Sequence, residues 1–152
     1  MGIRRKSREL IIQTIYALNY AETDQYLLNL DYINLYKDIL DNMASDNEIN
    51  EHSSIYKHAE KCLIMLLPKW ELIDEVINNH IGDYKFEKIG LLDLIIMRLA
   101  VFEMLYQEER TPPPVMINEA VELAKKFCAE KSPSLINAVL DNINRQLIVV
   151  SC

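Results

Sequence analysis

The chain has 152 residues, of which 50% are hydrophobic and 26% charged, and its formal net charge is −7. This length and balance predict one globular domain, residues 1–152, and exclude a disordered or low-complexity chain. Only 3 glycines occur, so the common glycine-rich nucleotide-binding loops are excluded and a fold of many short strands is disfavoured. The 3 cysteines lack paired spacing, which indicates a reducing compartment.

No segment predicts export or membrane insertion. The basic N-terminal segment is followed by too few consecutive apolar residues for a signal peptide. The most apolar run, 91–106, contains Asp93, Arg98 and Glu103 and is too short to span a bilayer. We therefore expect a cytoplasmic protein with no membrane partner.

Positive charge is concentrated at the N-terminus. Arg4, Arg5, Lys6 and Arg8 give the first nine residues a net charge of +3, which leaves −10 on the rest of the chain. Such an asymmetry suggests an anionic partner at the basic end. A solvated terminus explains the same charges, so both interpretations stay open on charge alone.

Apolar residues recur at helical spacing over 7–20 and again over 24–40, which predicts the first two helices. The polar stretch 45–51 predicts a loop after them. Ser53 or Ser54 can cap a third helix by accepting hydrogen bonds from the N–H groups of its first turn.

The middle of the chain predicts a buried central helix. Pro68 interrupts the third helix, because proline lacks an N–H group, and a fourth helix is expected over about 69–80. The segment 87–107 is apolar on nearly every side, so we expect other helices to surround it, and the Thr-Pro-Pro-Pro sequence at 111–114 to end it. Its predicted core residues are Leu92, Ile95, Ile96 and Leu99.

Two amphipathic helices complete the predicted fold. Over 117–127 the apolar residues form one stripe at helical spacing. The stripe consists of Ile117, Ala120, Val121, Ala124 and Phe127. The last helix is expected to begin with Ser132 as its cap and Pro133 in its first turn. No segment predicts a strand, so the sequence predicts an all-α fold of about seven helices.

Metal or catalytic chemistry finds little support in the sequence. His58 and Cys62 lie four residues apart, and His52 or His80 could join them around a metal ion. No second closely spaced pair of ligands exists, and no nucleophile or acid–base motif is present. We expect no metal, no cofactor and no catalytic residues.

Carboxylates gather at the distal end of the central helix, where negative charge is unfavourable for the helix dipole. A partner-facing turn explains them better than acid–base chemistry, because no His accompanies them. We therefore expect Glu103, Glu108 and Glu109 to contact a basic protein partner, which the acidic body of the chain favours.

The first helix carries an unusual combination of side chains on one face. The face consists of Arg5, Glu9, Gln13 and Tyr16, with Arg4 and Arg8 beside it. Guanidinium, amide and aromatic groups are those that pair with phosphates, read base edges and stack on single-stranded RNA. A surface ion pair between Arg5 and Glu9 explains the same pattern, so geometry leaves both interpretations open.

Three segments resemble the family of the transcription antitermination factor NusB. RRKSRELIIQTIY at 4–16 resembles the R-R-x-x-R-E-x-x-x-Q-x-L-Y opening of the family, and MRLAVFEMLY at 97–106 resembles its L-R-x-A-x-x-E-L central helix. INEAVELAKKF at 117–127, with the S-x-x-x-I-N-x-V-L-D pattern at 132–141, resembles its most characteristic segment. Residues 20–85 agree only in their apolar pattern.

The resemblance implies an all-helical fold of two small perpendicular helical bundles. It also implies binding to boxA, a single-stranded RNA element of ribosomal and phage leader transcripts, as a heterodimer with the ribosomal protein NusE. In the family this pair joins the RNA polymerase elongation complex with other Nus factors and promotes ribosomal RNA transcription, without enzymatic activity. Whether the free protein is a homodimer stays open.

The resemblance also assigns RNA-binding residues. They are Arg4, Arg5, Arg8, Gln13 and Tyr16 in the first helix, and Ser132 and Asn137 in a second patch. The chain departs from the family at Cys128 and Ala138, where glycine is usual, and at Leu135, where an aromatic residue is common. We therefore expect the second patch to bind RNA more weakly. The carboxylate-rich turn is our predicted NusE contact.

Two other functions compete with RNA binding. A helical adaptor could keep the protein partner and have lost RNA recognition. A fragment of an enzyme is the third interpretation, because the same helical domain precedes an RNA cytosine methyltransferase in some proteins. That enzyme needs a cofactor-binding sheet in a much longer chain.

Overall fold

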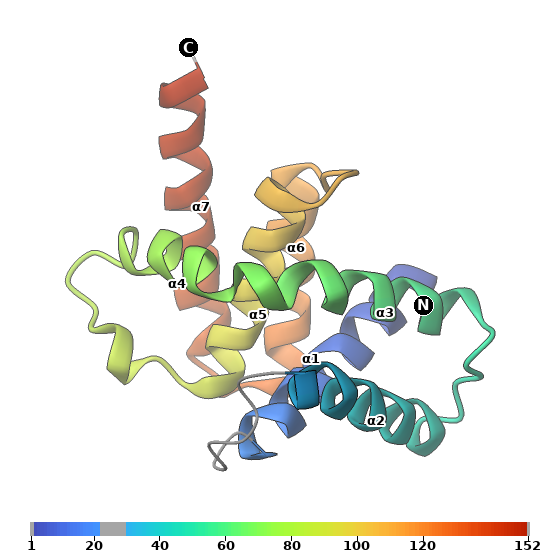
Figure 1. The fold of residues 1–152 in the computed structure, drawn as a ribbon. Helices are drawn as coiled ribbons and strands as arrows, with labels where there is room; N and C mark the ends of the chain where they lie inside the picture. Colours follow the sequence, from blue (N-terminus) through green and yellow to red (C-terminus); the bar gives the residue numbers. More distant parts are fainter. Residues whose placement is uncertain (1, 22–29, 152) are drawn as a thin grey trace. The chain divides into compact units, whose positions relative to one another are not determined.

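The structure is a computed structural model that describes residues 2–21 and 30–151 (Figure 1). The described α-helices are α1 (Ile3–Ala21), α2 (Leu30–Asp46), α3 (Ser54–Leu66), α4 (Trp70–Asn78), α5 (Leu91–Val101), α6 (Pro113–Phe127) and α7 (Ser132–Ser151). Within these residues there is no β-strand, so the prediction of an all-α fold of about seven helices is confirmed. None of these helices is long and apolar enough to cross a membrane.

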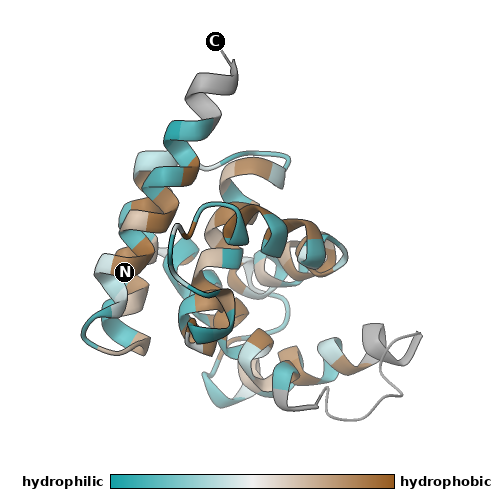
Figure 2. Ribbon diagram, turned by 90° about the vertical axis from the view of Figure 1, so that its left-hand side faces the viewer, coloured by the Kyte–Doolittle hydropathy of each residue, from teal (hydrophilic) through white to brown (hydrophobic). Residues whose placement is uncertain are grey.

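The chain divides into two compact units, Met1–Met65 and Leu66–Cys152. The first unit contains α1, α2 and nearly all of α3, and α1 packs against α2 within it. The second contains α4 to α7, and its most extensive helix contact joins α6 and α7. Figure 2 shows hydrophobic and hydrophilic residues alternating around the helices, as expected where one side of each helix is buried.

The α1 helix contributes one continuous apolar face to the first unit. Its buried apolar residues are Leu10, Ile11, Ile12, Ile15 and Leu18. Ser7 and Thr14 are also fully buried, and their hydroxyls donate to carbonyl oxygens, which removes the cost of burying them. The Ser7 hydroxyl lies 3.0 Å from the Ile3 carbonyl and 3.2 Å from the Ile55 carbonyl, so it also joins α1 to α3.

The connections around α2 and α3 follow the sequence signals only in part. The α2 helix begins at Leu30, and the start predicted at Asp24 lies outside the described residues. Between the two possible caps of α3, the structure selects Ser53, whose hydroxyl oxygen accepts from the Tyr56 N–H at 3.2 Å. Pro68 lies in a short 3₁₀ helix, Leu67–Lys69, which leads directly into α4.

The predicted central helix begins later than expected, and its last turn is a π-helix that reaches the expected end. Gly90 has extended backbone angles and α5 begins after it, so the expected start near Glu87 is wrong. At the other end, Phe102–Tyr106 forms a π-helical turn. The central position itself is confirmed, because Ile95, Ile96 and Leu99 have no exposed surface, while Leu92 is half-buried.

The α6 helix begins four residues before the predicted start, at Pro113, because proline is well tolerated in a first helical turn. The predicted stripe is only partly correct. The buried residues are Met116, Ala120, Leu123 and Ala124, while Ile117 and Val121 are half-exposed. The helix ends at Phe127, and the next residue, Cys128, has a φ of −113° and a ψ of 175°, extended angles that need no glycine.

Candidate nucleic-acid interface

The basic first turn of α1 presents its cations unequally. Arg4 and Lys6 are exposed, Arg5 is half-buried, and Arg8 is 5% exposed. Arg4 and Arg8 lie about one turn apart on the same side of α1, but Arg4 lies next to the start of the helix at Ile3 and Arg8 one turn further along it. Of the three predicted arginines, Arg4 is therefore the most accessible to a phosphate. Sequence reasoning counted Lys6 as charge but did not place it in the site.

Arg4 also contacts α3. Its Nη1 lies 2.8 Å from Nε2 of His58. Because a guanidinium can only donate, the imidazole nitrogen accepts in this arrangement. Fifty-four positions separate the two residues, so no local pattern in the sequence could have linked them. The contact connects the first turn of α1 to the middle of α3 within the first unit.

The predicted face of α1 is partly open to solvent. Arg5, Glu9, Gln13 and Tyr16 are all half-buried and follow one another at helical spacing. The Gln13 carbonyl oxygen accepts from Asn47 Nδ2 at 2.8 Å, which fixes the amide. Its amide nitrogen is then the end of the group that does not bind Asn47.

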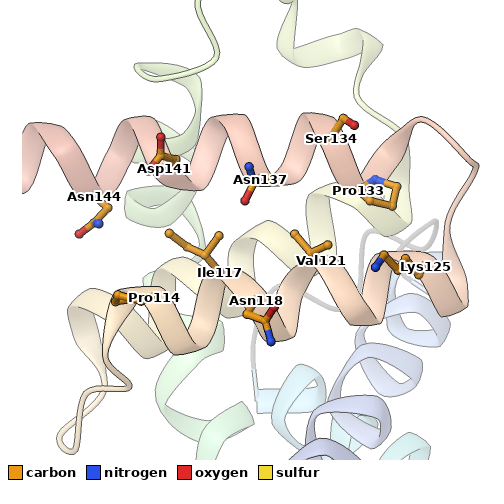
Figure 3. Close-up of a pocket in the computed structure, with 10 residues that line it drawn as sticks. All are labelled: Pro114, Ile117, Asn118, Val121, Lys125, Pro133, Ser134, Asn137, Asp141 and Asn144. Carbon is orange, nitrogen blue, oxygen red and sulfur yellow. The ribbon is translucent and has the colours of Figure 1, made fainter.

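The second predicted patch lies in the other unit, where a groove runs between α6 and α7 (Figure 3). The groove has a volume of about 570 Å³. It is lined by Pro114, Ile117, Asn118, Val121, Lys125, Pro133, Ser134, Asn137, Asp141 and Asn144. Asn137 is exposed in this groove, whereas Ser132 is 6% exposed and does not line it. The structure therefore gives the two predicted residues different surroundings.

The charged groups of this groove are paired along their own helices. Lys125 Nζ lies 3.1 Å from a Glu122 carboxylate oxygen, and Arg145 Nη2 lies 2.9 Å from an Asp141 oxygen. The uncharged polar side chains of the lining are the amides of Asn118, Asn137 and Asn144 and the hydroxyl of Ser134. Amides donate and accept together, so this lining suits base edges better than phosphates.

The carboxylate-rich turn after α5 is only partly exposed. Glu103 is 2% exposed, its carboxylate accepts from the Thr111 hydroxyl at 2.7 Å, and its backbone carbonyl accepts from the Thr111 N–H at 2.9 Å. Glu103 therefore stabilises the turn and does not present its carboxylate at the surface. This corrects its predicted role, while Glu108 and Glu109 are exposed.

A metal centre has no support in the described part of the chain. No group of three or more His, Cys, Asp or Glu side chains could hold a metal ion there. Of the two spaced ligands singled out in the sequence, His58 contacts Arg4 and Cys62 is buried.

Comparison with known proteins decides the family. The NusB family matches residues 5–145, which include both predicted patches except Arg4. The chain belongs to the NusB family. It is 37% identical to the transcription antitermination protein NusB of Geotalea daltonii over 149 residues, which cover 97% of each chain.

Solved structures show the same fold. The chain is similar to NusB of T. maritima with a TM-score of 0.76 and 22% identity, over 94% of this chain and 91% of that one. It is also similar to a chain of a crystal structure of antitermination factors NusB and NusE in complex with dsRNA. That similarity has a TM-score of 0.76 and 20% identity, over 96% of this chain and 98% of the other. The NusB-like fold expected from the sequence is therefore confirmed.

Proposed function

We propose that the protein is a transcription antitermination factor that binds boxA RNA together with NusE and promotes processive transcription of ribosomal RNA. Membership of the NusB family supports this role, because its curated relatives carry that name. The observation that carries the RNA-binding part is the cationic first turn of α1, with Arg4 and Lys6 exposed beside the polar face of Gln13 and Tyr16.

The first helix supplies two kinds of contact. Arg4, Arg5 and Lys6 neutralise phosphates, which provides sequence-independent affinity. Gln13 and Tyr16, further along the same face, contact bases by hydrogen bonding and stacking. Arg8, with 5% of its surface exposed, contributes mainly by supporting this surface from within the unit.

The groove between α6 and α7 supplies a second, uncharged contact. Asn137 and the neighbouring amides hydrogen-bond an unstacked base, while the paired charges of Lys125 and Asp141 keep the lining close to neutral. Ser132 is buried at the first residue of α7, so its role in this proposal is to stabilise the start of that helix and not to contact RNA.

The protein partner in this proposal is NusE. A structure similar in fold to this chain is described as NusB and NusE in complex with dsRNA, which supports such an assembly. Glu108 and Glu109 are exposed and suit a basic ribosomal protein. The pair acts without catalysis on the RNA polymerase elongation complex with other Nus factors, which places the protein in the cytoplasm.

A titration with short RNAs tests this function. The protein is titrated into labelled boxA RNA and into a scrambled RNA of equal length and composition, each with and without NusE. We expect tighter binding to boxA than to the scrambled RNA, and a further gain with NusE. Equal binding of both RNAs in the presence of NusE would contradict sequence-specific recognition, and no binding of either would leave only an adaptor function.

A further inference from the structure

The exposed side of α3 is bordered by a carboxylate on one edge and by a histidine that contacts an arginine of α1 on the other. Glu60 lies on the edge towards α2, where burial and then the charge of Glu60 raise the pKa of Tyr36. His58 lies on the other edge, in contact with Arg4 of α1. The carboxylate of Glu60 thus faces α2, and the exposed surface between Glu60 and His58 carries the remaining charged side chains of the helix.

Two lysines lie on the exposed side of α3, between His58 and Glu60. At 3.6 residues per turn, Lys61 lies roughly 60° and Lys57 roughly 100° around the helix from His58, both in the direction of Glu60. Both are exposed, and they are four residues apart, so their Cβ atoms lie about 6 Å from each other. Among the described residues, neither lysine ammonium forms an ion pair. We call Lys57 and Lys61 the α3 lysine edge.

The α3 lysine edge continues the cationic surface of α1. The Arg4–His58 contact and the hydrogen bond from Ser7 to the Ile55 carbonyl hold the start of α1 against α3, and Figure 1 shows the N-terminal end of α1 beside the start of α3. In the sequence 1–65, six of the seven Lys and Arg residues fall on the first two turns of α1 or on α3. Positive charge in this unit is therefore gathered where the two helices meet.

We propose that the α3 lysine edge is a second phosphate-binding element, so that single-stranded RNA bound along α1 continues over α3. This inference rests on the proposed function and extends its contact surface to a helix outside the family's arginine motif. An anionic polymer suits the edge better than the protein partner, because a basic ribosomal protein is repelled by uncompensated lysines. His58 is a positioning residue, since it holds Arg4 beside the edge.

Salt dependence of RNA binding tests the proposal. The variant Lys57→Gln/Lys61→Gln is titrated with boxA RNA and NusE over a series of salt concentrations. Each lost phosphate contact should lower the slope of log K against log salt by about 0.7, so two should lower it by about 1.4. With affinity at 1 M salt unchanged, this corresponds to binding weaker by about 25-fold at 0.1 M salt.

The matched control is Lys85→Gln/Lys88→Gln, which removes two exposed lysines from the other unit and should change neither affinity nor slope. Equal losses in both double variants would show a net-charge effect and overturn the proposal. An unchanged slope in Lys57→Gln/Lys61→Gln, while Arg4→Ala/Arg5→Ala loses affinity, would overturn the α3 contact and leave the proposed function intact. If the unmodified protein with NusE binds no RNA, both proposals fall.

Discussion

The guanidinium of Arg98 binds both carboxylate oxygens of Asp74, with Nε 2.6 Å from Oδ1 and Nη2 2.8 Å from Oδ2. The same guanidinium lies 3.7 Å from the centre of the Trp70 ring. These contacts join α4 to α5, and the Arg98 side chain is 8% exposed. A buried guanidinium with this geometry is satisfied only while its carboxylate partner is present.

Asp74→Ala should therefore destabilise the protein strongly. It leaves the Arg98 charge buried without its partner, which costs about 3 kcal/mol of unfolding free energy. Chemical denaturation followed by circular dichroism measures this loss. Glu71→Ala, at an exposed position of the same helix, is the control and should change stability little. Equal stability of the two variants would mean that the pair does not hold α4 to α5.

The thiol of Cys128 should make stability depend on alkaline pH. Burial, then the hydrogen bond and charge of Asp93, raise its pKa from 9.0 to about 12. A pKa raised in the folded state gives a contribution that is complete below pH 9 and is lost as the pH rises towards 12. The difference in unfolding free energy between the unmodified protein and Cys128→Ala should therefore shrink over this range. If the difference in unfolding free energy stays constant between pH 9 and pH 12, the pKa of Cys128 is not raised by the fold.

Tyr16→Ala should weaken RNA binding without changing its salt dependence. A stacking contact contributes about 1 to 3 kcal/mol and releases no counterion, so the affinity falls at every salt concentration by the same factor. Tyr84→Ala removes an exposed tyrosine of the other unit and serves as the control. A reduced salt slope in Tyr16→Ala would mean that the change disturbs phosphate contacts, and unchanged affinity would mean that no base stacks there.

Charge reversal at Glu108 and Glu109 should slow association with NusE. Exposed carboxylates accelerate encounter with a basic partner, so the double lysine variant should have a lower association rate and a weaker dependence on salt. Stopped-flow or surface-based kinetics measures both. The control reverses Asp46 and Glu51, which are exposed in the other unit. If the association rate falls equally in both variants, the effect comes from total charge and the NusE contact lies elsewhere.

Local features of the fold could be predicted, because they depend on neighbouring residues. The buried side of α1 follows from the helical spacing of its apolar residues, and the buried positions of Ile95, Ile96 and Leu99 follow from a segment that is apolar on nearly every side. The start of α5 could not be found in this way, because the extended angles of Gly90 interrupt a sequence that stays helical in pattern. Likewise, the hydrophobicity of Ile117 predicts burial, but the position of α7 leaves it lining a groove.

The candidate site depended more on contacts between distant residues. The arginine motif was visible because its members are neighbours, whereas the Arg4–His58 contact requires the packing of α3 against α1. For Glu103 the sequence predicted a surface contact, whereas the structure buries the side chain. Its charge suggested a surface position, but the Thr111 hydroxyl donates a hydrogen bond to the carboxylate, which offsets part of the free-energy cost of burying it.

RNA binding by a variant without the arginine motif tests the central claim most directly. Arg4→Ala/Arg5→Ala/Arg8→Ala is titrated with boxA RNA in the presence of NusE, after its melting curve has shown that it folds. The matched lysine variant, Arg4→Lys/Arg5→Lys/Arg8→Lys, keeps the charges and controls for loss of the side chains. We expect the alanine variant to lose affinity and to lower the salt slope by about 0.7 for each phosphate contact removed, while the lysine variant retains most of both. Undiminished RNA affinity in the alanine variant would contradict RNA binding along α1 and favour a protein adaptor.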